Sequence, residues 1–268
     1  MAVDQAVAEA VQAETAPPTL RFYTWRRRTL SLGYGQPASL VRVDRASELG
    51  IDVVRRPTGG QAILHHDELT YSVALPRRHP IAARGVVDSY DAISEALIGG
   101  MTALGLVPDE VAGEPGSSSP ASPLPQGVLP ATVPSPLDGN AGTDADAICF
   151  ATPTNHEISV GGAKIIGSAQ TRLYRHRGLL QHGTIALSHD PALYELLDAP
   201  PGPARLLGLR DLLPAPLTIG SLIEVFAGAF AVHLKLALTP QSLTAVESAR
   251  ADELVRVRYA TDAWLNRC

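Results

Sequence analysis

The sequence predicts an α+β protein in which helices cover a mixed, largely antiparallel sheet. Apolar side chains alternate along residues 52–75 and 156–187, and glycine turns interrupt both stretches, which is typical of neighbouring strands. Apolar residues recur every three or four positions along residues 86–104, as on the buried face of a helix. Because the alternation before residue 108 resumes after residue 145, we expect both parts to contribute to one sheet.

Composition limits the class of protein. The 268 residues are 45% hydrophobic and 18% charged, which fits a single globular domain over 1–268 with a sizeable core. A net charge of −5 argues against a nucleic-acid binder. Only Cys149 and Cys268 are present, the first residues do not resemble a signal peptide, and no apolar stretch is long enough to cross a membrane. We therefore expect a cytoplasmic protein without membrane association.

The elements of the first part follow from local patterns. Residues 2–14 favour a helix with Val3, Val7 and Val11 on one face, ended by Pro17-Pro18. Residues 20–25 and 29–34 are predicted to form a hairpin. The other predicted elements are a helix over 38–48, strands over 52–56, 62–66 and 69–75, and a helix over 86–104.

Residues 108–145 differ from the rest of the chain. They are rich in Pro, Ser, Gly and Ala and poor in large apolar residues, so they cannot bury enough surface to offset the entropy of ordering. We predict a disordered insertion here, inside the domain. After it we expect strands over 156–160, 163–173 and 178–187, then helices over 191–197, 203–209, 219–237 and 240–255.

The run from Arg55 to His65, Arg-Arg-Pro-Thr-Gly-Gly-Gln-Ala-Ile-Leu-His, is the most informative motif. Its order predicts a strand, a tight glycine turn and a second strand. Glycines adopt positive φ without steric cost and let the backbone approach a ligand. Arginines beside such a turn suit an acidic group or a carbonyl oxygen.

A second motif follows the Gly161-Gly162 turn and contains Lys164 in the run Lys-Ile-Ile-Gly-Ser-Ala-Gln. A strand lysine is ordinarily exposed and without a special role. Small residues at Gly167 and Ala169, however, leave room for this lysine to reach a cleft whose floor is open to a ligand. A third run, Gln181-His-Gly-Thr-Ile185, lies on the next predicted strand.

These three runs, in this order and spacing, resemble the signatures of the lipoate-protein ligase and octanoyltransferase family. The resemblance covers nearly the whole chain outside the insertion. It implies the fold shared with biotin-protein ligases, and the attachment of an octanoyl or lipoyl group to one lysine of a carrier domain. It also implies a monomer.

Cys149-Phe150 resembles the Cys-Phe pair of the cysteine-dependent branch, octanoyl-[acyl carrier protein]:protein N-octanoyltransferases, and lies 15 positions before Lys164. The resemblance implies a thioester on Cys149, a thiolate favoured by Lys164, and no cofactor. A lone cysteine without this context is more often an inert buried residue. The donor would be octanoyl-acyl carrier protein, and the acceptor a glycine cleavage H protein or an E2 lipoyl domain.

The same resemblance implies a set of substrate-binding positions at the pocket mouth and along its floor. These are Arg55, Arg56, Thr58, Gly59, Gly60, His65, Gly167, Ser168 and Ala169. His182 is expected to make a structural hydrogen bond. No cluster has the spacing of metal ligands, so no metal is predicted.

Two departures bear on the choice of reaction. Gln61 replaces the third glycine of the ligase-like Thr-Gly-Gly-Gly run, and residues 67–70 (Asp-Glu-Leu-Thr) replace the ligases' Gly-Asn-Leu-Asn. Both departures make it harder to infer nucleotide binding, and both fit the transferase branch better. Three alternatives stay open: an ATP-dependent lipoate-protein ligase, an amidotransferase moving octanoyl from H protein to E2 domains, and a non-catalytic acyl-binding or carrier-binding relative.

The run Arg26-Arg27-Arg28 is a separate local feature. Three consecutive arginines are most often a solvated loop. They would also attract an acidic carrier protein.

Overall fold

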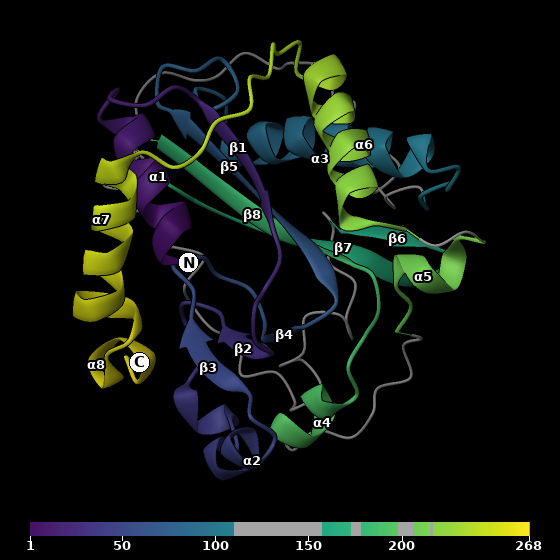
Figure 1. The fold of residues 1–268 in the computed structure, drawn as a ribbon. Helices are drawn as coiled ribbons and strands as arrows, with labels where there is room; N and C mark the ends of the chain where they lie inside the picture. Colours follow the sequence, from purple (N-terminus) through teal and green to yellow (C-terminus); the bar gives the residue numbers. More distant parts are fainter. Residues whose placement is uncertain (110–156, 173–177, 198–205, 215–216, 268) are drawn as a thin grey trace, which may run out of the picture.

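The computed structural model describes residues 1–109, 157–172, 178–197, 206–214 and 217–267. Five strands form an antiparallel sheet in the order β1-β5-β8-β7-β6 (Figure 1). Its strands are β1 (Thr19–Tyr23), β5 (Glu68–Pro76), β6 (Ile158–Val160), β7 (Ala163–Arg172) and β8 (Gly178–Ala186). Since β5 pairs with β8 over nine residues, the parts before and after the insertion share one sheet, as the sequence predicts.

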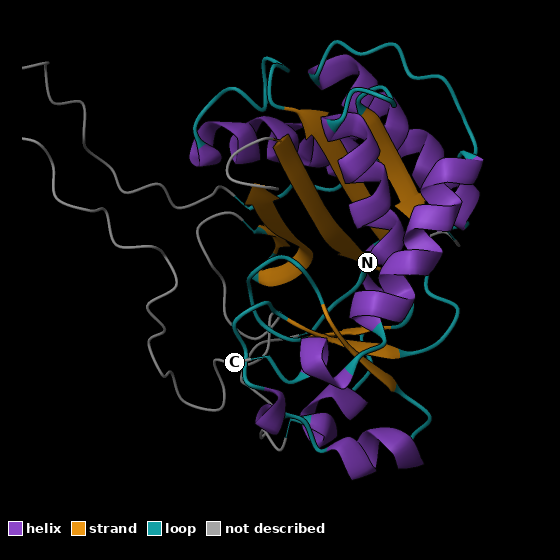
Figure 2. Cartoon of the chain, turned by 90° about the vertical axis from the view of Figure 1, so that its left-hand side faces the viewer, coloured by secondary structure: helices purple, strands orange, loops and turns teal. Residues whose placement is uncertain are grey.

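A second, three-stranded sheet has the order β3-β2-β4 and lies below one end of the large sheet in Figure 2. It contains β2 (Thr29–Leu32), β3 (Asp52–Arg55) and β4 (Ile63–His65). The pair β2–β3 is parallel and the pair β2–β4 is antiparallel. The predicted mixed, largely antiparallel arrangement is therefore confirmed, with its strands divided between two sheets.

Helices cover both faces of the large sheet. On one face α1 (Ala2–Gln12) packs Val7 and Val11 against Ala74 and Leu180, and α7 (Ala245–Leu254) lies beside it. On the other face α3 (Val86–Ala103) and α6 (Ile219–His233) close the main core. The shorter helices are η1 (Ala38–Leu40), α2 (Val43–Glu48), α4 (Ala192–Leu196), α5 (Leu209–Leu212), η3 (Val255–Tyr259, a π-helix) and α8 (Asp262–Leu265).

The predicted hairpin over 20–25 and 29–34 is wrong. Strand β1 pairs with β5, whereas β2 enters the small sheet between β3 and β4. All four residues of β2 are buried, which suits a central strand covered on both faces. For the same reason the turn after Arg55 is not a hairpin turn, because β2 separates the two strands that it joins.

Several helix boundaries also differ from those predicted. The 38–48 helix is split in two, and the 219–237 helix ends at His233. The last long helix begins after Thr244 rather than at residue 240, because Thr244 and Glu247 form a capping box. The helix expected over 203–209 is wrong over residues 206–208, which are not helical, and α5 begins only at Leu209; residues 203–205 lie outside the described ranges. The predicted insertion lies outside them from residue 110 onward.

Candidate active site

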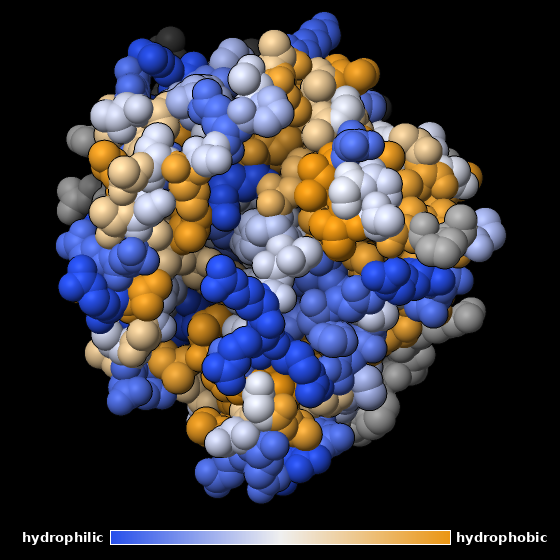
Figure 3. Space-filling view, in the orientation of Figure 1, coloured by the Kyte–Doolittle hydropathy of each residue, from blue (hydrophilic) through white to orange (hydrophobic). Residues whose placement is uncertain are grey.

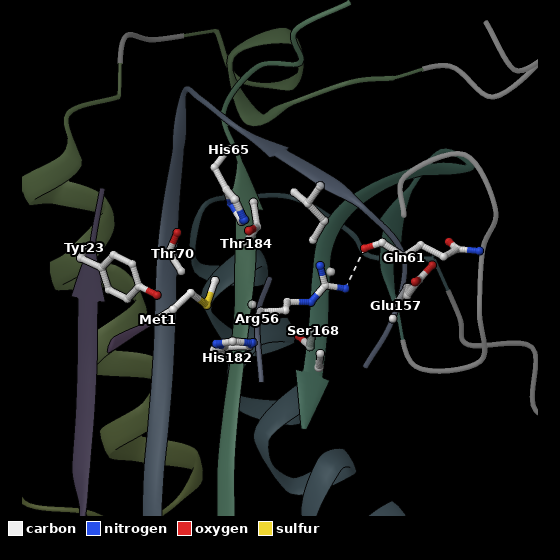
Figure 4. A pocket seen from close by; sticks show the side chains of 15 residues that line it. Met1, Tyr23, Arg56, Gln61, His65, Thr70, Glu157, Ser168, His182 and Thr184 are labelled. Atoms are coloured by element: carbon white, nitrogen blue, oxygen red, sulfur yellow. Dashed lines mark hydrogen bonds between the residues drawn. The ribbon is translucent and has the colours of Figure 1, made fainter. Parts of the chain in front are cut away.

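A pocket of about 230 Å³ opens where the small sheet meets the large one (Figure 4). In Figure 4, Tyr23, Thr70 and Met1 lie toward one end of it, and Gln61 and Glu157 lie toward the other. The other lining residues are Arg56, Gly60, Ile63, His65, Gly167, Ser168, Ala169, His182, Gly183 and Thr184. Segments far apart in the sequence therefore meet at one cavity.

Arg56 shapes the turn of the first motif. Its guanidinium donates to the carbonyl oxygens of Gly59 (2.9 Å), Gln61 (2.7 Å) and Ser31 (3.1 Å). Gly60 has φ +90°, and a Cβ there would lie 2.9 Å from Arg56 Nη2. The turn therefore requires glycine at position 60. The Arg56 guanidinium donates to backbone carbonyl oxygens of the chain itself.

The neighbouring Arg55 points elsewhere. Its guanidinium is fully buried and donates to the carbonyl oxygens of Gly33 (2.8 Å), Gln36 (2.5 Å) and Leu265 (2.6 Å). The indole of Trp264 donates in turn to the Arg55 carbonyl (2.9 Å). Arg55 thus holds the helix α8 against β3 and does not line the pocket.

His65 is held at both ring nitrogens. Nδ1 lies 2.8 Å from Glu68 Oε1, and Nε2 lies 2.8 Å from Ser31 Oγ. The ring stacks on the indole of Trp25, with centroids 4.0 Å apart and an interplanar angle of 12°. The hydroxyl of Thr70 accepts from Trp25 Nε1 and donates to Glu68. The hydrogen bonds therefore run from Trp25 through Thr70 to the Glu68 carboxylate.

Ser31, His65 and Glu68 have the hydrogen-bond order of a serine nucleophile triad. Ser31, however, is fully buried and does not line the pocket. Its hydroxyl also accepts from Arg56 Nη1 (3.2 Å). The arrangement therefore fixes the His65 ring as a wall of the pocket and does not present a nucleophile to it.

His182 lies on β8 with Nε2 2.6 Å from the Thr58 hydroxyl, so the predicted structural hydrogen bond is present. Its Nδ1 lies 3.6 Å from Oδ2 of the buried Asp4 on α1. Burial lowers the pKa of His182, which favours the neutral imidazole. Asp4 also accepts from Tyr23 (2.6 Å) and Arg21, and charges and hydrogen bonds outweigh burial so that its pKa is lowered.

Lys164 is buried on β7 and its Nζ donates to Glu157, which lines the pocket. The exposed fractions of the two side chains are 2% and 9%. Glu157 directly precedes β6, and the register between β6 and β7 shifts after Ile158. This irregularity accompanies a contact between Glu157 and Lys164, although Lys164 pairs with Ser159 in the ladder.

Family comparison agrees with this geometry. The family model of the lipoyl protein ligase A/B catalytic domain matches residues 1–231. The chain belongs to this family. A protein named octanoyltransferase LipM from Brevibacillus brevis is 37% identical over 98% of the chain and 92% of its own length. Its namesake from Symbiobacterium thermophilum is 39% identical with the same coverage.

Solved structures of this family share the fold. The Thermoplasma acidophilum protein Ta0514, a putative lipoate protein ligase with bound lipoic acid, gives a TM-score of 0.71. It is 24% identical over 100% of the chain and 92% of its own. A lipoate-protein ligase A bound with ATP gives 0.74 at 24% identity, over 98% and 91%. At this identity the likeness concerns the fold alone.

The structure brings most of the family's signature residues to the pocket. Of the expected binding residues, those that line it are Arg56, Gly60, His65, Gly167, Ser168 and Ala169. Thr58 is hydrogen-bonded to His182 but does not line the pocket. Arg55, Gly59 and Lys164 do not line it either. Cys149 lies outside the described residues.

Sequence reasoning missed several lining residues, most notably Glu157. Nothing in its local sequence marks it, since its importance arises from a partner across the Gly161-Gly162 hairpin. Gly183, in the third motif, also lines the pocket. A Cβ there would lie 2.4 Å from the Gly167 carbonyl oxygen and 2.8 Å from Ser168 Oγ, so glycine permits this close strand contact.

The arginine run lies between β1 and β2. Hydrophilic side chains gather over the middle of the face of the molecule that Figure 3 shows. Arg27 lies 3.4 Å from Asp52, and Arg28 pairs with Asp190. These pairs reduce the positive charge that the run presents to a carrier.

Within the residues that the structure describes, no three His, Cys, Asp or Glu side chains gather as a metal site. No described helix is long and apolar enough to cross a membrane.

Proposed function

We propose that this chain moves an octanoyl group from octanoyl-acyl carrier protein to a lysine of a lipoyl carrier domain, such as glycine cleavage H protein. The acyl group would be carried between them as a thioester on Cys149. Octanoyl transfer is supported by relatives named octanoyltransferase LipM, which are 37% and 39% identical over nearly the full chain.

The observation that carries this proposal is the meeting of three motifs at one pocket. Arg56 and Gly60 come from the first, Gly167–Ala169 from the second and His182–Thr184 from the third. Each motif lies on a different strand or turn, so only the folded chain joins them. Pockets lined by apolar groups with a few placed polar side chains are typical of small-ligand sites.

The size of the pocket suits the group to be moved. A cavity of about 150 Å³ accommodates benzene, which has six carbons. In proportion, about 230 Å³ accommodates roughly nine non-hydrogen atoms. An octanoyl group has eight carbons and one carbonyl oxygen, so it would fill the cavity.

The chemistry needs no nucleotide. A thiolate of Cys149 would attack the carrier thioester, forming one thioester as another breaks, at little thermodynamic cost. Lys164 would favour that thiolate by its charge and oppose the negative charge that develops on the carbonyl oxygen. The acceptor amine then forms an amide, which is downhill from a thioester.

Intact mass spectrometry tests this proposal. The protein is mixed with octanoyl-acyl carrier protein without ATP, and the adduct is mapped and then offered to apo H protein. We expect one octanoyl adduct at Cys149 that passes to the acceptor, and none in Cys149→Ala. Acceptor modification only from free octanoate or lipoate with ATP would make the chain a ligase and overturn the proposal.

A further inference from the structure

We propose that Glu157 is the proton acceptor for the lysine that receives the acyl group. This inference rests on the proposed function, because it assigns a residue to the second half of that reaction. An acceptor lysine arrives as an ammonium ion at neutral pH and attacks only after it loses a proton. The reaction therefore needs a base near the acyl group.

Glu157 is the single carboxylate among the described residues that line the pocket. In Figure 4 it lies with Gln61 at the end of the cavity away from Tyr23 and Thr70. Its side chain is 9% exposed, so a group that enters the pocket replaces little bulk water around it. A carboxylate with so little exposure that faces a cavity attracts a cation and can take its proton.

The carboxylate already holds an ammonium group. Lys164 Nζ donates to Glu157 Oε1, and 2% of the Lys164 side chain is exposed. Charges this deeply buried require a partner of opposite sign. The carboxylate thus accepts from a lysine ammonium, which is the same chemical group that a carrier lysine brings to the pocket.

The two histidines of the pocket are engaged differently. His65 uses Nδ1 with Glu68 and Nε2 with Ser31. His182 uses Nε2 with Thr58, and its Nδ1 faces the Asp4 carboxylate at 3.6 Å. Taking a proton at either ring would change these contacts. Glu157 also has a partner, Lys164, but that partner is an ammonium group like the one that a carrier lysine brings.

The step balances without a further reactant. The acceptor ammonium gives one proton to the Glu157 carboxylate, and the free amine attacks the thioester carbonyl. The C–N bond forms, the C–S bond breaks, and the thiolate leaves with the electron pair. The second amine proton goes to that thiolate, which restores the thiol, and Glu157 returns its proton to solvent.

The test compares two nucleophiles on one preformed octanoyl-enzyme. Hydroxylamine is uncharged at neutral pH and needs no base, whereas the carrier lysine does. General-base removal typically costs 10²–10⁴-fold. For Glu157→Gln we expect transfer to apo H protein to slow about 100-fold, while hydroxylamine release stays within about twofold of the unsubstituted enzyme. Glu157→Asp keeps the charge and should recover part of the transfer rate.

The rates of transfer to apo H protein and of release by hydroxylamine are measured on the same acyl-enzyme sample. Their ratio does not depend on how much of the variant is folded, so a less stable variant remains informative. Equal slowing of both nucleophiles would show a structural role and overturn the proposal, as would no slowing of either. Failure of Glu157→Gln to form acyl-enzyme, where the unsubstituted chain does, would place Glu157 in the first step instead. Absence of acyl-enzyme in the unsubstituted chain would refute the proposed function and this inference with it.

Discussion

Two buried acid–base pairs border the pocket, and they are built for different purposes. In the His65–Glu68 pair, the carboxylate also accepts from the hydroxyls of Thr70 (2.5 Å) and Thr184 (3.1 Å), and it does not line the cavity. In the Lys164–Glu157 pair, the carboxylate lines the cavity itself. The first pair fixes a wall, and the second places a charged group where a reactant can meet it.

A carboxylate with little exposure can therefore serve either to fix a neighbouring ring or to face a reactant within one site. A carboxylate with several fixed donors resists rearrangement, because each donor would lose its acceptor. A carboxylate that faces a cavity can exchange one cation for another. Substitutions in the two pairs should therefore affect stability and chemistry in different proportions.

The largest effect is expected from Lys164→Met. It leaves Glu157 buried without its cation, which typically costs about 3–5 kcal/mol of unfolding free energy. Acyl-enzyme formation should fall about 1,000-fold, a barrier increase of roughly 4 kcal/mol, because the charge that we propose to favour the thiolate is lost. Urea unfolding and intact mass measure the two effects.

The double variant Lys164→Met/Glu157→Gln is the matched control. It removes both charges and should recover most of the unfolding free energy but none of the activity. Equal stability of the single and double variants would contradict an energetic coupling of this pair.

Glu68→Ala should come next. His65 Nδ1 and two threonine hydroxyls lose their acceptor, so the unfolding free energy should drop by about 3 kcal/mol. We expect kcat/KM to fall about tenfold, mainly through KM, because a wall of the acyl pocket loosens while the reacting groups remain. Glu68→Gln keeps an acceptor oxygen and should lose less of both. A change confined to kcat would mean that Glu68 acts in the chemistry.

A smaller effect concerns pH. Burial holds the pKa of His182 below its unfolded value of about 6.5. The folded state therefore binds fewer protons, and this stabilising contribution is present above pH ~6.5 and is lost as pH falls below it. His182→Gln should flatten the decline of unfolding free energy between about pH 7 and pH 5.

The exposed His66 gives the control for that measurement, since His66→Gln removes a histidine without changing the pocket. Burial also lowers the pKa of His79 and His189, so part of the slope should persist in His182→Gln. An unchanged slope in His182→Gln would show that this imidazole titrates alike in both states.

The smallest effect is expected on the surface. Arg45 donates to Glu48 (2.8 Å) and Glu195 (2.6 Å), but all three side chains are exposed by a third or more. Solvent screens such pairs. Arg45→Gln should match the unsubstituted chain in melting temperature and in transfer rate. A loss comparable to that of Glu68→Ala would contradict the distinction between buried and exposed pairs.

Much of the fold was predictable because its patterns are local. The helix α3 and the strands around Gly161-Gly162 have strong periodicity, and the structure has them. The pairing of Thr29–Leu32 was not predictable, because four apolar-patterned residues fit a hairpin and a central strand equally well. Only the neighbours β3 and β4 decide it, and they come later in the chain.

The site was predictable to a similar degree. Motifs indicated which turns and strands line the pocket, but not the distinction between Arg55 and Arg56, which depends on Leu265 near the C-terminus. The role of Glu157 was not predictable, because its contact with Lys164 accompanies an irregular register between β6 and β7. His65 and Glu68, three residues apart across a turn, were the contact that spacing could have suggested.

A crystal structure of the trapped octanoyl-enzyme tests the proposed reaction most directly. We expect a thioester on Cys149, the octanoyl chain in the cavity between His65 and Ser168, and Glu157 beside the thioester end. An octanoyl chain bound elsewhere, or attached to another residue, would contradict it.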